Sequence, residues 1–202
     1  MSEPTRLKYH SPVRSNWLAR FLNAGSPPVY VGFGSMIRED PTRCAREAVY
    51  SLKAIGQRGI LSIGCSGPIF PDVPVHVHVV REAPHDWLFP RCADVVHQRW
   101  CGPPHEGLRW ARPTLVSTVL GDQHFWGRKV AEAGAGPNVL PEKHFRGDRL
   151  ADALHVLVNG KFGASARRIA DHMQKEPGAE GAAIVGERLT VKARRQTARA
   201  SL

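Results

Sequence analysis

The chain has 202 residues, of which 42% are hydrophobic, and a formal net charge of +10. This length suits one globular domain or slightly more, with enough apolar residues for a sizeable core. No apolar run approaches the roughly 20 residues of a membrane-spanning helix, and the polar start lacks the apolar core of a signal peptide. These features argue against an integral membrane or secreted protein and predict a cytoplasmic one.

The positive charge limits the partners to be expected. A charge of this size fits nucleic acid, an anionic membrane surface or a nucleotide diphosphate. Basic residues are spread along the chain and crowd near its end, without the interleaved aromatic residues of a platform for single-stranded nucleic acid. We therefore expect no nucleic-acid partner. A nucleotide ligand and peripheral contact with a membrane both remain compatible with the charge.

Three parts are predicted along the chain. Residues 1–28 form a lead-in segment with a short helix at Trp17–Leu22, which Gly25-Ser26-Pro27-Pro28 ends. Residues 29–175 carry alternating strand and helix patterns and form the ligand-binding domain. Residues 176–202 are basic and rich in alanine and glycine, which predicts a frayed helix or a flexible, disordered tail.

The middle part predicts an α/β fold. Short β-branched runs bounded by glycine or proline are typical of buried parallel strands, and they occur at 29–33, 59–63, 75–80, 93–97, 114–119 and 138–140. Helices are expected between Asp40, as N-cap, and Gly56, and near 123–133 and 147–158. This alternation predicts a Rossmann-like parallel sheet with helices on both faces, which binds ligands beyond the carboxyl ends of its strands.

Polar or glycine-rich motifs follow several of these strands. Gly32-Phe33-Gly34-Ser35 follows the first strand, where glycines let the backbone approach a phosphate group. Without further context, an ordinary tight turn explains these residues as well.

The segment Pro84-His85-Asp86-Trp87-Leu88-Phe89-Pro90 follows the third strand. Trp87 offers a flat apolar face to a base. The alternative is that Trp87, Leu88 and Phe89 pack against the sheet, and the two roles are compatible.

Gly121-Asp122-Gln123 follows the fifth strand. A carboxylate beside an amide can accept from and donate to neighbouring sugar hydroxyls. The alternative is that Asp122 serves as N-cap of a helix that starts at Gln123.

These motifs, together with the segments 95–109, 113–116 and 121–127, resemble the nucleotide-sugar-binding, C-terminal half of GT-B glycosyltransferases, above all the sterol glucosyltransferase-like ones. The resemblance covers about residues 15–160. It implies a UDP-sugar such as UDP-glucose as co-substrate, no cofactor or metal, and hexose transfer to a sterol, lipid or small-molecule hydroxyl. It also implies donor-binding roles for the residues Gly34, Ser35, His85, Trp87, His97, Gln98, Gly102, Asp122 and Gln123.

The segment after the fourth strand departs from the family pattern His-His-Gly-Gly-Ala-Gly-Thr. Here the ungapped alignment gives His97, Gln98, Arg99, Trp100, Cys101, Gly102 and Pro103. Bulky residues replace two glycines, and a proline replaces threonine, which adds volume and removes amide and hydroxyl donors near the expected phosphate. We expect weakened phosphate binding. A metal site at His97, Cys101 and His105 is not favoured, because Pro103-Pro104 interrupts a helix through that stretch.

A reading-frame shift offers one explanation of this departure. If Arg99 to Gly102 is encoded CGG-TGG-TGC-GG, a frame one base later encodes Gly-Gly-Ala, the family's missing residues. We hypothesise a short compensated frameshift, as an alternative to degeneration or adaptation. Resequencing the locus decides the point, since a codon other than CGG or AGG at Arg99 excludes it.

GT-B enzymes have two domains, and the resemblance covers the second. The first domain, which holds the acceptor and the general base, has no counterpart here, so no catalytic residue is assigned and we expect no sugar transfer by the chain alone. A partner chain that supplies this domain is one possibility, and a truncated or mis-predicted gene product is the other. The alternative function is a non-catalytic remnant or interaction module that binds nucleotide weakly or not at all.

Overall fold

The computed structural model describes residues 16–33, 40–64, 73–98, 102–118 and 121–200. The chain divides into two compact units, Met1–Ala170 and Asp171–Leu202. The predicted division at residues 28 and 175 into lead-in, ligand-binding domain and tail stays a prediction.

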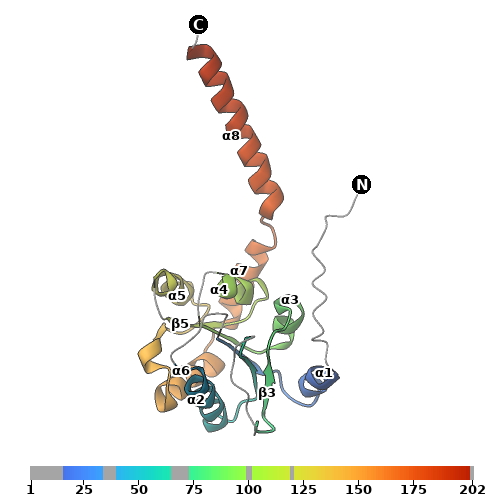
Figure 1. Cartoon of the computed structure of the whole chain (residues 1–202), viewed down its shortest axis with the longest axis vertical. Coiled ribbons are helices and arrows are strands. Elements are labelled where there is room, and N and C mark those ends of the chain that lie inside the picture. The colour runs from blue at the N-terminus through green and yellow to red at the C-terminus, as the bar shows by residue number, and fades with distance from the viewer. Residues whose placement is uncertain (1–15, 34–39, 65–72, 99–101, 119–120, 201–202) are drawn as a thin grey trace. The chain divides into compact units, whose positions relative to one another are not determined.

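The first unit is built on a parallel sheet of six strands in the order β3-β2-β1-β4-β5-β6 (Figure 1). The strands are β1 (Val29–Gly32), β2 (Gly59–Ser62), β3 (Val77–Val80), β4 (Val95–Gln98), β5 (Thr114–Thr118) and β6 (Leu140–Pro141). The strand order runs outward in opposite directions from β1 and β4, so a topological switch point lies between them. The predicted α/β fold with a parallel sheet is confirmed.

Helices connect the strands and continue beyond them. They are α1 (Asn16–Asn23), α2 (Pro41–Ala54), α3 (His85–Leu88), α4 (Gly102–Arg109), α5 (Gln123–Glu132), α6 (Gly147–Asn159), α7 (Gly163–Met173) and α8 (Gly178–Ala200), with 3-10 turns at Phe89–Arg91 and Glu142–His144. Within the described ranges, none of these helices combines the length and the apolar character needed to cross a membrane.

Helix α2 begins and ends as its sequence predicts. The carboxylate of Asp40 accepts a hydrogen bond from the amide of Arg43 at 2.8 Å, and Pro41 occupies the first turn. This arrangement satisfies one of the free amides of the first turn. After the last turn, Gly56 takes a left-handed conformation with φ of 65°, which glycine adopts without steric cost.

Several predicted boundaries differ from the structure. The third strand begins at Val77 rather than Val75, because the Val77 amide donates to the Pro74 carbonyl and closes a turn that leaves Val75 98% exposed. The last strand comprises 140–141 instead of 138–140. Helices α3, α4 and α7 were not among the predicted elements, and residues 178–200 of the tail are helical, in agreement with one of the two alternatives for that segment.

The two faces of the sheet carry separate cores. On one face, Val31 and Leu115 pack with Leu52 of α2 and Leu154 of α6, and Figure 1 shows these two helices side by side. On the other face, Tyr30 and its neighbours pack with α1, α3 and the 3-10 turn after α3. Alternate residues of β1 therefore face different helices, as the two-residue period of a strand requires.

We expect Gly136→Ala to lower the free energy of unfolding by about 1–3 kcal/mol, the usual cost of overpacking. A β-carbon at Gly136 would overlap the carbonyl of Thr114, whose amide is bonded to the adjacent Ala135 carbonyl at 3.0 Å. Urea denaturation measures the change. Gly163→Ala is the matched control, because a β-carbon there meets nothing within 4 Å. Equal losses in both variants would contradict the steric explanation.

Candidate functional site

The strand register brings most predicted site residues to one edge of the sheet. Gly32 of β1 lies opposite His97 of β4, and Gln98 lies opposite Ser117 of β5. Since the strands are parallel, the segments that follow them leave from this same carboxyl edge, beside the switch point. Gly34, Ser35 and the residues 99–101 lie outside the described residues.

Three aromatic rings, those of Tyr30, Phe89 and His85, lie around His97. Its ring centroid lies 5.5 Å from those of Tyr30 and Phe89 and 5.9 Å from that of His85. The His85 ring stacks on Phe89 at 4.3 Å, and its Nε2 lies 3.4 Å from the Tyr30 hydroxyl. The structure therefore joins two predicted site histidines, from β4 and from the start of α3, in one cluster.

Burial keeps this cluster uncharged near neutral pH. It lowers the pKa of His97 well below its ordinary value, and the neighbouring His85 lowers it further. Burial also lowers the pKa of His85, against the influence of Glu106 and Asp86, and raises the pKa of Tyr30 to about 12. The imidazole of His97 can thus offer a ligand a hydrogen bond but no charge. Its buried Nε2 has no hydrogen-bond partner among the described residues.

The segment after β3 packs on the sheet as the alternative interpretation expects. Leu88 and Phe89 are fully buried, whereas Trp87 is half-buried at the border of the same core. The guanidinium of Arg91 lies 4.8 Å from the Trp87 ring centroid, so one ring face already has a cationic neighbour. The contact of this segment with a base stays a prediction.

Asp122 stands at the N-cap position of α5 without making the cap hydrogen bond. Its exposed carboxylate instead accepts from the indole Nε1 of Trp126 at 3.1 Å. The Trp126 ring in turn meets His105 of α4 at 4.9 Å. Gln123, the first residue of α5, is buried. The proposed capping role of the Asp122 side chain is therefore not seen, and the carboxylate is held at the carboxyl edge.

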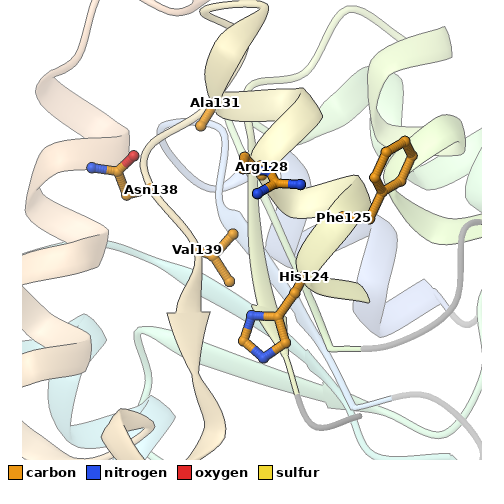
Figure 2. A pocket seen from close by; sticks show the side chains of 6 residues that line it. All are labelled: His124, Phe125, Arg128, Ala131, Asn138 and Val139. Atoms are coloured by element: carbon orange, nitrogen blue, oxygen red, sulfur yellow. The ribbon is translucent and has the colours of Figure 1, made fainter. Parts of the chain in front are cut away.

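A pocket of about 350 Å³ lies between α5 and the chain before β6. Figure 2 shows His124, Arg128 and Ala131 projecting from α5 near Asn138 and Val139. The His124 ring lies 3.2 Å from the Thr118 hydroxyl at the end of β5. This end of the pocket thus adjoins the edge that carries Asp122.

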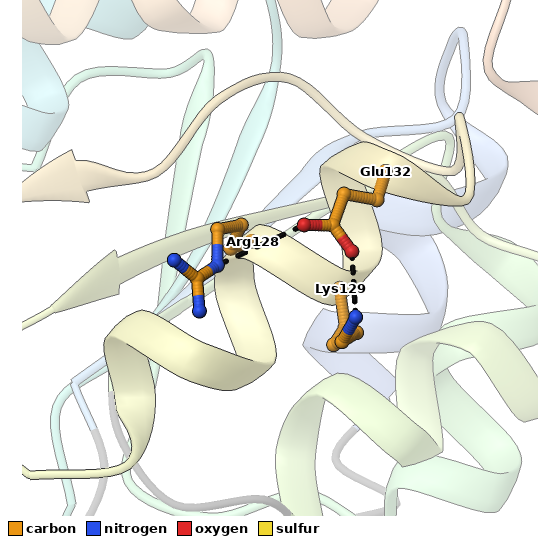
Figure 3. Close-up of polar contacts among 3 residues, drawn as sticks. All are labelled: Arg128, Lys129 and Glu132. Atoms are coloured by element: carbon orange, nitrogen blue, oxygen red, sulfur yellow. Dashed lines mark hydrogen bonds and ion pairs between the residues drawn. The ribbon is translucent and has the colours of Figure 1, made fainter.

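On the exposed face of α5, one acidic residue pairs with two basic residues. Glu132 lies 2.7 Å from the Lys129 ammonium and 3.7 Å from Nε of Arg128 (Figure 3). Both pairs are exposed and span one helical turn, so each contributes little to stability. Of these residues, Arg128 also lines the pocket.

Metal-binding geometry is not found in the described part of the chain, where no three His, Cys, Asp or Glu side chains gather closely enough. His97 lies in β4, whereas His105 lies in α4, which begins at Gly102. The two histidines are therefore not on one helical face, as Pro103-Pro104 predicted.

Sequence reasoning missed Tyr30, Phe89 and Thr118 as neighbours of the site. The two-residue period places Tyr30 on one face of β1, but it does not tell which strand lies next to it. Only the β1–β4 pairing brings Tyr30 beside His97.

We expect His97→Phe to change how stability depends on pH. Below about pH 6.5, the unfolded chain protonates His97 while the folded protein does not, so the wild type loses stability as pH falls. A phenylalanine ring fills the same space without this proton uptake. From pH 7 to pH 5, the free energy of unfolding of the variant should therefore rise relative to that of the wild type by up to about 1.4 kcal/mol per pH unit.

Urea unfolding at each pH measures this difference. Asp94, whose pKa burial raises to about 7, contributes the opposite slope, but it does so in both proteins and cancels in the comparison. Parallel stability curves would mean that His97 takes up its proton in the folded state.

Comparisons with known proteins identify the family. No family model matches the chain. Over 166 residues it is 37% identical to a sterol 3-beta-glucosyltransferase of Arabidopsis thaliana, which covers 82% of this chain and 26% of the relative. It is 34% identical over 169 residues to the vancomycin aglycone glucosyltransferase of Amycolatopsis orientalis, which covers 83% of this chain and 40% of the relative. The chain thus spans about a quarter to two-fifths of these two relatives.

Solved structures agree in fold. The spinosyn forosaminyltransferase matches with a TM-score of 0.70 and 20% identity, over 85% of this chain and 46% of that one. The glycosyltransferase of kitacinnamycin matches with a TM-score of 0.70 and 20% identity, over 82% of this chain and 44% of that one. Both are GT-B glycosyltransferases. The chain is therefore a domain of the sterol glucosyltransferase-like family of GT-B UDP-glycosyltransferases.

Proposed function

We propose that this domain binds a UDP-sugar, UDP-glucose or a close analogue, as donor for hexose transfer to a sterol, lipid or small-molecule hydroxyl. The observation that carries the proposal is the gathering of His85, His97 and Asp122 at the carboxyl edge of the sheet, beside the switch point. Parallel α/β sheets bind nucleotides at this place. The sterol glucosyltransferase relatives support the choice of donor and acceptor class.

Each segment of the edge has a part in the proposed complex. Gly34, Ser35 and the segment from Gln98 to Gly102 border the diphosphate, helped by the positive amino end of α4. His85 and Trp87 are proposed to contact the uridine. The uncharged imidazole of His97 is proposed to offer a hydrogen bond at the end of β4. Asp122 and Gln123 bind hydroxyls of the sugar. Amides and dipoles stabilise the diphosphate leaving group without a metal ion.

Sugar transfer in this proposal is a single displacement with inversion. An acceptor hydroxyl loses its proton to a base and attacks the anomeric carbon, while the bond to the diphosphate breaks and UDP leaves. We assign the base and the acceptor site to a separate domain, from further sequence or from a partner chain. The relatives' greater length supports this assignment.

A non-catalytic role is the second candidate, and the first turn of α4 favours it. Pro103 and Pro104 follow Gly102 directly in the helix, and neither has an N–H group. Proline is stable at this position, yet the free amides of a first turn are the groups that would bind phosphate. The domain would then bind nucleotide weakly or not at all.

We expect restoring the family segment to tighten UDP binding by about tenfold or more, the value of one recovered hydrogen bond to a charged group. The variant combines Gln98→His, Arg99→Gly, Trp100→Gly, Cys101→Ala and Pro103→Thr. Calorimetry with UDP on both proteins is the measurement. Equal affinities would show that the segment does not limit phosphate binding, and would remove the argument for the non-catalytic candidate.

We also expect Asp122→Ala to weaken UDP-glucose binding about tenfold or more while UDP binding stays unchanged, because UDP lacks the sugar. Loss of the exposed bond to Trp126 should cost less than about 1.5 kcal/mol of stability. Glu132→Ala, an exposed carboxylate on the same helix, is the matched control.

An unchanged ratio of the two affinities would remove Asp122 from the sugar site. If the wild-type chain binds neither ligand, the measurement is made in the background with the restored segment. Absence of binding there as well would overturn the proposed function.

A further inference from the structure

A second cavity opens at the opposite edge of the sheet, where β4 and β5 begin. It has a volume of about 510 Å³ and is lined by the residues just before these strands, the end of α6 and the start of α7. Asp94, Arg112 and Arg167 are its charged residues, and Leu157 and Val158 contribute apolar wall. The amino ends of parallel strands lie far from the carboxyl edge, so this cavity is separate from the proposed donor site.

Arg112 and Arg167 border this cavity, and neither forms an ion pair within the described residues, although Asp94 is near enough to influence the pKa of Arg112. Arg112 donates from Nη2 to the Pro90 carbonyl at 2.9 Å, but its buried Nε has no hydrogen-bond partner among the described residues. The ion pairs found in the described ranges join other basic residues to acids. A buried donor without an acceptor is costly, so the Arg112 guanidinium keeps hydrogen-bonding capacity that the described residues do not use.

The backbone holds Arg112 firmly at this position. Ala111, just before it, takes a left-handed conformation with φ of 56°, which is unfavourable for a residue with a side chain. The Arg112 amide donates to the Gly107 carbonyl at 2.9 Å, and its carbonyl accepts from the Thr114 hydroxyl at 3.0 Å. The strained turn between α4 and β5 therefore fixes the backbone of Arg112, one of the residues that line the cavity.

The remaining charges do not cancel those of the arginines. Asp94 is buried, and burial raises the pKa of its carboxyl to about 7 against the influence of Arg112. The acid is therefore partly protonated near neutral pH. Burial lowers the pKa of Arg112, and the charge of Arg167 lowers it further. The carboxyl end of α6 and the amino end of α7 carry opposite partial charges, so the cavity keeps a net positive potential.

We propose that this cavity binds a phosphate monoester, with the phosphate between Arg112 and Arg167. Guanidinium groups match phosphate oxygens with paired, charge-assisted hydrogen bonds. The volume lies in the range of small-molecule sites and exceeds the needs of a phosphate ion alone. Asp94, the buried acid among the lining residues, binds a hydroxyl of the ester. The phosphate belongs either to a soluble metabolite or to a phospholipid headgroup.

Binding of glycerol 3-phosphate, measured by calorimetry, tests the proposal, and flotation with phosphatidylcholine vesicles that contain phosphatidic acid tests the lipid source. We expect Arg167→Ala to weaken binding at least about tenfold and Asp94→Asn, which removes a negative charge, to tighten it. Arg168→Ala is the matched control, because Arg168 is the exposed neighbour on α7 that does not line the cavity.

Calorimetry and flotation together distinguish a soluble phosphate ester from a phospholipid headgroup. Binding of glycerol 3-phosphate that depends on Arg167 supports a soluble ligand. Flotation that depends on Arg167, without binding of the soluble ester, supports a lipid headgroup. Wild-type protein that binds neither probe overturns the proposal, and so do equal losses in Arg167→Ala and Arg168→Ala, which would show unspecific attraction to a basic surface.

Discussion

β1 pairs in parallel with β4, although two strands separate them in sequence, and the candidate site is arranged around that pairing. The switch in strand direction at this point leaves a crevice into which segments from both halves of the sheet lead. In the register of this pairing, Gly32 at the end of β1 lies opposite His97 of β4. A shift of one residue would turn His97 to the other face and separate it from Tyr30.

β4 runs between the two edges of the sheet at which the buried ionisable residues Asp94 and His97 lie. Asp94 precedes its first residue, and His97 lies near its last. Burial disfavours the charged form of both side chains, which raises the pKa of the acid to about 7 and lowers that of the histidine. Central strands of parallel sheets are normally apolar because both faces are covered. Polar residues at both ends of such a strand carry a desolvation cost that a binding function would explain.

Helix α4 begins within the segment for which the sequence predicts a departure from the family pattern. The helix begins after β4 with Gly102-Pro103-Pro104, so these residues are compatible with the fold. Proline suits the first turn of a helix sterically. The same residues remove hydrogen-bond donors that a phosphate would use. The segment is therefore compatible with the fold, whereas weaker phosphate binding stays a prediction.

The amino-acid sequence by itself determined the alternation of strands and helices, the start of α2 at Asp40 and Pro41, and the motifs that mark the family. These features depend on local chemistry: two-residue and helical periods, a capping carboxylate, and glycine or proline at turns. The start of β3, helix α3 and the role of the Asp122 carboxylate were not determined in this way. A turn at Pro74 shortens the strand. The Asp122 carboxylate accepts a hydrogen bond from the Trp126 indole instead of capping α5, as the local sequence pattern would predict. Only the tertiary structure decided the ring cluster at His97 and the arginine cavity at Arg112, because both depend on which strands and helices lie side by side, and that choice is made by packing between residues far apart in the chain.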